Sequence, residues 1–287
     1  MKSSHRIFFV AGIALVAIQI IQAFFRGYNE HWILALGYPL IVAPFSFWHG
    51  ILRYGWRDMI IFFIMIFSVG WIFESLSVAT GFPFGNYYYT DVLGYKLGQV
   101  PISVMPGYFS FGYISWVLAD VMIGKRDNSI RGWEWITIPL IASFFMSAWD
   151  LFTDPINSTF RPMWVWEEGG SYFGVPISNL LGWCFVVFVF YTLFAFYNRW
   201  RNNDKPAPEI TKYKWYWLLP IIMYFSSMLE VITAYLWRDN VLMTSLEGHE
   251  WWSKDMFGSM ILVALWTILP YSAYALWRLN KDFKADK

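Results

Sequence analysis

Eight apolar segments of this chain are each near the roughly 20 residues that an α-helix needs to cross a lipid bilayer. Polar breaks separate them, and only 14% of all residues are charged, whereas a soluble domain has about 25%. So few charges could not cover the surface of a soluble chain of this length. We therefore predict an all-α, polytopic integral membrane bundle with about eight transmembrane helices. The segments are Ile7–Phe25, Trp32–Leu52, Met59–Thr80, Val100–Ile123, Trp135–Thr153, Pro176–Asn198, Trp215–Trp237 and Met256–Trp277.

Lysine and arginine are distributed unevenly between the two sides that these segments define. The termini and the connections after the second, fourth and sixth segments hold all but five of the 21 Lys and Arg residues. Cytoplasmic connections carry such an excess in membrane proteins. We therefore predict that both termini are cytoplasmic and that the protein is a multi-pass protein of the cell (cytoplasmic) membrane. The five on the other side are Arg26, Lys96, Arg161, Arg238 and Lys254.

The connections between the segments differ in kind. A polar linker over residues 199–214 separates six segments from the last two, and we expect it to be cytoplasmic. On the other side, Gly81–Gly98 and Asp154–Val175 are long and rich in Gly, Pro and aromatic residues, so they are predicted to fold back on the bundle. We find no repeat, and expect residues 1–287 to form a single transmembrane domain.

Several functional classes are excluded by composition and motifs. The net charge of +1 argues against a nucleic-acid partner, and the single cysteine argues against a disulfide scaffold. The four histidines are scattered, so no metal site is predicted. There is no glycine-rich nucleotide-binding loop and no nucleophile elbow.

The predicted spans contain four acidic residues and no lysine or arginine. Ionisable residues in such positions are costly, and by default they indicate a functional site. Asp120 lies near the cytoplasmic end of its segment and is expected to reach water. Glu74, Asp150 and Glu230 each lie about 16 residues beyond the cytoplasmic ends of their helices. At 1.5 Å per residue they share one depth, roughly 24–26 Å along their helices.

Two further polar residues are expected in this acidic layer. Asp154 follows Asp150 by one helical turn, and Asn179 enters the layer from the opposite side. With no basic side chain in the spans to pair with the acids, burial favours the protonated form of a carboxyl group. Such a group can donate a proton. The alternative is that Tyr, Trp and Asn side chains hydrogen-bond the acids as purely structural contacts.

Aromatic residues make up 22% of the chain. Many tryptophans lie at predicted helix ends, which is typical of an interfacial belt. Trp71, Trp149 and Trp183 instead lie deep in their segments, close in sequence to the acidic layer. Because aromatic faces stabilise cations, a pocket with a proton donor, a second carboxylate and aromatic walls suits the addition of water across an alkene.

Two blocks of sequence between residues 71 and 183 stand out. The first, Glu74–Asp91, reads ESLSVATGFPFGNYYYTD. The second begins with AWDLFTDP at Ala148–Pro155 and continues through Trp164–Trp166, Gly169–Pro176 and Asn179–Trp183. In this order, the blocks resemble those of the membrane carotenoid hydratases, a family of carotenoid biosynthesis proteins, and they define a core motif region over residues 71–183.

The resemblance implies a cofactor-independent hydratase that adds water across the terminal double bond of an acyclic carotenoid end group, giving a tertiary alcohol. The carotenoid would enter from the surrounding membrane lipids, and water is the second substrate. Asp150 or Glu74 would donate the proton, and the other carboxylate, with Asp154 or Asn179, would orient water; Glu230 is a further catalytic candidate. The predicted substrate-binding residues are Trp71, Phe84, Tyr87, Tyr89, Trp149, Trp166, Tyr172, Asn179 and Trp183.

Two other functions share these sequence features. A proton-coupled carrier would use the buried acids as a relay, and it predicts inverted repeats, which the sequence lacks. A non-catalytic carotenoid- or lipid-binding membrane protein shares the aromatic pocket but has no need for acids at one depth. Expression in cells that make an acyclic carotene distinguishes the three by a product heavier by one water, by bound unchanged pigment, or by proton-linked uptake.

Overall fold

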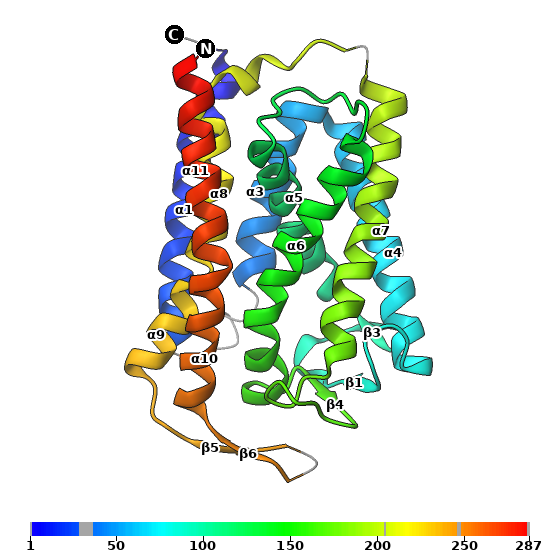
Figure 1. Cartoon of the computed structure of the whole chain (residues 1–287), viewed down its shortest axis with the longest axis vertical. Helices are drawn as coiled ribbons and strands as arrows, with labels where there is room; N and C mark the ends of the chain where they lie inside the picture. The colour runs from blue at the N-terminus through cyan, green and yellow to red at the C-terminus, as the bar shows by residue number, and fades with distance from the viewer. Residues whose placement is uncertain (1, 29–36, 204, 246–247, 286–287) are drawn as a thin grey trace.

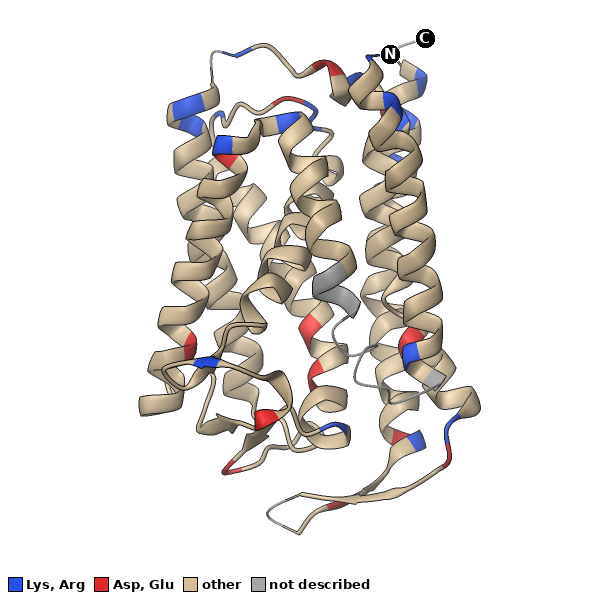
Figure 2. Ribbon diagram, turned by 180° about the vertical axis from the view of Figure 1, so that it is seen from behind, with Lys and Arg blue, Asp and Glu red and all other residues tan. Residues whose placement is uncertain are grey.

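The structure is a computed structural model and describes residues 2–28, 37–203, 205–245 and 248–285. Its long helices lie side by side in one bundle (Figure 1). The beginning of α1 and the end of α11 lie together at one end, called the terminal end below, and the short strands lie at the other, called the pocket end. Figure 2 shows Lys and Arg concentrated at the terminal end.

The helices and strands of the described residues occupy the following ranges. The α-helices are α1 (Ser3–Tyr28), α3 (Gly37–Tyr54), α4 (Trp56–Thr80), α5 (Val104–Met122), α6 (Glu134–Pro155), α7 (Ile177–Asn202), α8 (Lys214–Ser226), α9 (Leu229–Trp237), α10 (Ser253–Trp266) and α11 (Ile268–Ala285). Two 3₁₀ turns, η1 (Asp91–Leu93) and η3 (Glu209–Lys212), and one π-helical turn, η2 (Ile156–Phe160), connect them. The strands are β1 (Tyr87–Tyr89), β2 (Lys96–Leu97), β3 (Val100–Pro101), β4 (Trp164–Trp166), β5 (Leu242–Thr244) and β6 (Glu250–Trp252).

Six helical stretches of the described chain are long and apolar enough to cross a membrane. They are Ser3–Gly27, Trp56–Thr80, Glu134–Phe160, Ile177–Asn202, Lys214–Trp237 and Ser253–Ala285. α3 and α5 coincide with the second and fourth predicted segments, although residues 32–36 of the second segment lie outside the described residues. The predicted all-α class is confirmed, with these six helical stretches as candidate membrane spans.

The last two predicted segments are each interrupted helices. α8 ends at Ser226, where the Ser226 and Ser227 hydroxyls donate to the carbonyl oxygens of Met223 and Tyr224. Such local side-chain bonds compete with the helical hydrogen-bond ladder. α9 then begins at Leu229 and packs mainly against α1. The pocket-end part of this segment is therefore directed toward α1 and away from α4 and α6.

The two long connections at the pocket end are joined by a pair of antiparallel strands. β1 pairs with β4, with Tyr87 opposite Trp166 and Tyr89 opposite Trp164. Because successive side chains of a strand point to opposite faces, Tyr87 and Tyr89 are both buried while Tyr88 between them is 44% exposed. The strand pairing therefore directs two tyrosine side chains into the bundle.

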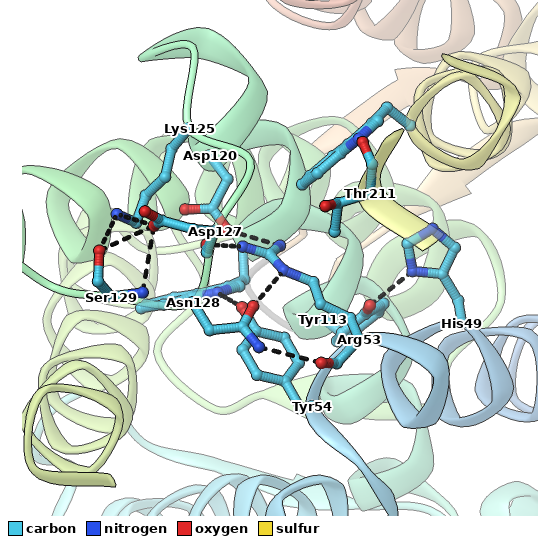
Figure 3. A network of polar contacts seen from close by, with 12 residues as sticks. His49, Arg53, Tyr54, Tyr113, Asp120, Lys125, Asp127, Asn128, Ser129 and Thr211 are labelled. Carbon is cyan, nitrogen blue, oxygen red and sulfur yellow. Dashed lines mark hydrogen bonds and ion pairs between the residues drawn. The ribbon is translucent and has the colours of Figure 1, made fainter. Parts of the chain in front are cut away.

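A buried polar network connects helices at the terminal end (Figure 3). Arg53 Nη1 lies 2.8 Å from Asp120 Oδ2, and both side chains are almost fully buried. Arg53 also donates from Nε to Asn128 Oδ1 and from Nη2 to the Asp127 carbonyl oxygen, both at 2.8 Å. The expectation that Asp120 reaches water is therefore wrong. Arg53, which the sequence placed in a cytoplasmic connection, belongs to α3 and points inward.

Candidate functional site

A partly open pocket lies among α4, α5, α6 and α7, under the paired strands β1 and β4. It holds about 880 Å³ of space, its open mouth included. Its lining is mostly apolar and aromatic, with a few acids and amides. The lining residues are Arg26, Glu74, Phe84, Tyr87, Tyr89, Leu93, Ser103, Val104, Gly107, Tyr108, Phe111, Trp149, Asp150, Thr153, Asp154, Asn157, Trp164, Trp166, Asn179 and Trp183.

Glu74 of α4 accepts hydrogen bonds from three tyrosine hydroxyls. Tyr108 donates to Oε1 at 2.5 Å, Tyr89 donates to Oε2 at 2.9 Å, and Tyr87 also donates to Oε2. Burial raises the pKa of Tyr87 and Tyr89 well above the usual tyrosine value, and the neighbouring Glu74 carboxyl raises it further. Both hydroxyls therefore stay protonated and remain donors. The arrangement holds the Glu74 carboxyl in one orientation at the pocket wall.

Asp150 and Asp154 of α6 share one amide from α7. Asn179 Nδ2 donates to Asp154 Oδ2 at 2.5 Å and, more loosely, to Asp150 Oδ2 at 3.4 Å. The other oxygen of Asp154 accepts a hydrogen bond from Trp164 Nε1 at 2.9 Å. Both carboxyls are buried and line the pocket. Asp154 thus has a short hydrogen bond at each oxygen, whereas the bond from Asn179 to Asp150 is long.

Stacked aromatic pairs form two walls of the pocket. Tyr108 of α5 stacks on Trp183 of α7, with ring centroids 4.5 Å apart and an interplanar angle of 12°. Phe111 of α5 stacks on Trp149 of α6 at 4.3 Å and 17°. Trp166 of β4 lines the pocket from the strand side. These walls offer flat π faces beside the carboxyl groups, which suit a planar apolar ligand or a cationic one.

Glu230 of α9 does not line the pocket and instead forms ion pairs with two arginines. Arg26 Nε lies 3.1 Å and Arg161 Nη1 lies 2.7 Å from Glu230 Oε1. The expectation that no basic side chain can pair with the acids is therefore wrong for Glu230. α1 continues to Tyr28, and the helical path after α6 continues through η2, so both arginines reach the bundle interior. Arg26 also donates to Asn157 Oδ1 at 3.2 Å, at the pocket edge.

Most of the predicted site residues meet at this pocket, although their roles stay predictions. Those that line it are Glu74, Phe84, Tyr87, Tyr89, Trp149, Asp150, Asp154, Trp166, Asn179 and Trp183. Trp71 and Tyr172 lie outside the lining, as Glu230 does. The Trp71 indole donates to the Leu97 carbonyl oxygen at 3.1 Å, and the Tyr172 hydroxyl donates to the Leu151 carbonyl oxygen at 2.9 Å.

Sequence reasoning missed Tyr108, Trp164 and Phe111 as pocket residues. A signal existed for Tyr108, because it lies just over one turn after α5 begins and Glu74 lies fewer than two turns before α4 ends. These helices run antiparallel, so both side chains lie at similar depth. Trp164 depends on the β1–β4 register, which the sequence does not specify. In the described part of the chain, no group of three or more His, Cys, Asp and Glu side chains could hold a metal ion.

A family model described as carotenoid biosynthesis protein matches residues 31–250. This match covers more than half of the chain and includes every pocket-lining residue except Arg26. Neither the curated proteins nor the solved structures compared with the chain give a match. From the length of the family match and the sequence blocks around the pocket, the chain belongs to the carotenoid biosynthesis protein family.

Proposed function

We propose that the protein is a membrane carotenoid hydratase that adds water across the terminal double bond of an acyclic carotenoid end group. The observation that carries this proposal is the pair Asp150 and Asp154, bridged by Asn179 and facing a pocket with stacked aromatic walls. Membership in the carotenoid biosynthesis family supports a long, conjugated apolar substrate. The product is a tertiary alcohol.

Asp150 is our candidate for the proton donor. Two carboxyl groups that share one amide in a buried site cannot both be ionised without strong repulsion, so one of them keeps a proton. Asp154 has short hydrogen bonds from Asn179 and Trp164 at its two oxygens, which suit a carboxylate. Asp150 has the longer contact, which leaves its proton available to a substrate in the pocket.

The reaction then proceeds in two steps, protonation by Asp150 and attack by a water molecule that Glu74 holds. The Asp150 proton bonds to the less substituted carbon of the terminal double bond, which leaves a tertiary carbocation that the π faces of Trp149 and Trp183 stabilise. A carboxylate has about four acceptor sites, and three tyrosines occupy three of those on Glu74. The remaining site accepts a hydrogen bond from the attacking water. Water oxygen bonds to the cationic carbon, and its surplus proton returns to the Asp150–Asp154 pair.

We also infer eight membrane crossings with the terminal end in the cytoplasm. α3 and α5 add two crossings to the six apolar stretches. α5 is buried along almost its whole length, so its tyrosines and serines need not face lipid. The concentration of Lys and Arg at the terminal end supports the cytoplasmic orientation in the cell membrane.

The test is expression of the protein in cells that accumulate lycopene, followed by mass analysis of the extracted pigments. The wild-type protein should yield a product heavier by one water. Because a positioned general acid contributes about 10²–10⁴-fold to a rate, Asp150→Asn should lower product formation by roughly that factor. Lycopene should still co-purify with this variant, because the amide keeps the shape of the side chain.

The matched control is Asp58→Asn. Like Asp150, Asp58 is a buried acid, but it belongs to α4, accepts hydrogen bonds from Tyr197 and Asn202, and does not line the pocket. This variant should hydrate lycopene at the wild-type rate per folded molecule. Normal hydration by Asp150→Asn would refute the assignment of the acid. Unchanged lycopene bound to the wild-type protein would favour a carotenoid-binding protein instead.

A further inference from the structure

We infer that Gly107 of α5 is a specificity-determining position, where the chain of the bound carotenoid passes against the helix backbone. The inference rests on the proposed substrate class and deepens it by naming the contact that admits a flat polyene. Gly107 lines the pocket. A Cβ atom built at this residue would have no neighbour within 4 Å.

This empty surrounding sets Gly107 apart from the other helical glycines whose surroundings are described. At each of those, a Cβ atom would meet a neighbouring side chain or backbone atom within 4 Å, so helix packing accounts for the glycine. Those residues are Gly12, Gly27, Gly50, Gly70, Gly112, Gly182 and Gly258. Packing gives no such reason at Gly107, although glycine is less favourable than alanine inside a helix.

The side chains around Gly107 show what the free space can accommodate. Val104 and Phe111 lie three and four residues from Gly107, hence on the same face of α5, and both line the pocket, as does the adjacent Tyr108. Tyr108 and Phe111 are held by their stacked tryptophan partners. Beside these rings, the bare backbone at Gly107 leaves a gap in the pocket wall. Glycine commonly occurs where a ligand approaches the backbone closely.

A flat, rigid chain is the ligand that fits this gap. The gap lies on the same wall as Tyr108, whose hydroxyl donates to Glu74, so a chain across Gly107 would place its end group near the carboxyl groups. A conjugated polyene is thin enough to lie flat on the backbone and cannot bend around an added side chain. A side chain at position 107 should therefore obstruct the polyene while leaving the protein fold intact.

The experiment compares Gly107→Ala and Gly107→Leu with the matched control Gly258→Ala. Gly258 is a helical glycine of α10 that lies outside the pocket, where a Cβ atom would make an ordinary contact with Tyr235 at 3.5 Å. Each variant is purified from lycopene-producing cells, and bound pigment per protein, hydrated product and thermal unfolding midpoint are measured. We expect Gly107→Leu to retain the wild-type midpoint but to lose bound lycopene and product by roughly tenfold or more, because of steric overlap.

The outcomes separate this inference from the proposed hydratase activity. Gly107→Ala should give a smaller loss than Gly107→Leu, and Gly258→Ala should give none. If the wild-type protein binds lycopene without hydrating it and Gly107→Leu loses that binding, the inference holds and the proposed activity fails. If Gly107→Leu binds and hydrates lycopene as well as the wild-type protein does, the inference about Gly107 fails and the proposed activity stands. A wild-type protein that neither binds nor converts lycopene would overturn both.

Discussion

Replacement of Asp120 by alanine tests whether the buried ion pair at the terminal end holds α3 and α5 together. Arg53 and Asp120 have side-chain exposures of 0% and 1%, and their charged atoms are 2.8 Å apart. Removing one partner of a buried pair costs about 3–5 kcal/mol, because the other charge remains buried. Arg53 keeps its hydrogen bonds to Asn128 and to the Asp127 carbonyl oxygen, so we expect a loss of about 3 kcal/mol, at the lower end of that range.

The assay is unfolding of the purified protein in detergent, followed by tryptophan fluorescence. The control is Glu209→Gln, which removes a Lys2–Glu209 pair of the same 2.8 Å separation but with side-chain exposures of 66% and 41%. Exposed pairs contribute little to stability, so this variant should unfold like the wild type. A double variant, Arg53→Met with Asp120→Leu, should regain much of the lost stability because no charge remains unpaired. Equal unfolding of Asp120→Ala and Glu209→Gln would refute the burial of Asp120.

Two further predictions concern residues near the pocket. Glu230→Gln should lower the free energy of unfolding by about 3 kcal/mol, because Arg26 and Arg161 lose their shared carboxylate. Hydration per folded molecule should stay unchanged. A loss of hydration at unchanged stability would support a catalytic role for Glu230 instead. Because burial raises the pKa of Tyr87, its hydroxyl stays protonated at about pH 10, where exposed tyrosines ionise. Tyr87→Phe should therefore leave the phenolate absorbance in that range unchanged, and a loss of amplitude would contradict the burial.

Counting residues along helices predicted which acids lie at one depth, and it was sufficient for the core of the candidate site. Glu74 and Asp150 belong to different helices, α4 and α6, and both line one pocket. The rise per residue of an α-helix is nearly constant, so a position within a span translates directly into a height. Asn179 could be placed for the same reason, since α7 begins only two residues before it.

Height alone does not specify which helices are neighbours, and this is where the sequence was insufficient. The sequence predicts one depth for Glu230 and Glu74, but the interruption between α8 and α9 directs Glu230 to α1, where Arg26 pairs with it. The position of Asp120 near a helix end predicts contact with water, but Arg53 belongs to α3 and pairs with it inside the bundle. In both cases a helix extends beyond its apolar run and carries an arginine inward. Side chains with long aliphatic stems can bury their charge in this way when a carboxylate is within reach.

The buried helix α5 contributes one residue to each of two polar regions of the protein, the ion pair at the terminal end and the pocket. At the terminal end, Asp120 ties α5 to Arg53 of α3; at the pocket end, Tyr108 ties it to Glu74 of α4. Apolar packing is non-directional, so it opposes a slide of the helix along its axis less specifically than a polar contact does. A slide would move Gly107 and Tyr108 relative to the carboxyl groups of α4 and α6, so two directional contacts at opposite ends fix the height of the pocket wall. A change at Asp120 that shifts α5 without unfolding the protein should therefore lower hydration and leave the chemistry of Asp150 itself unaltered.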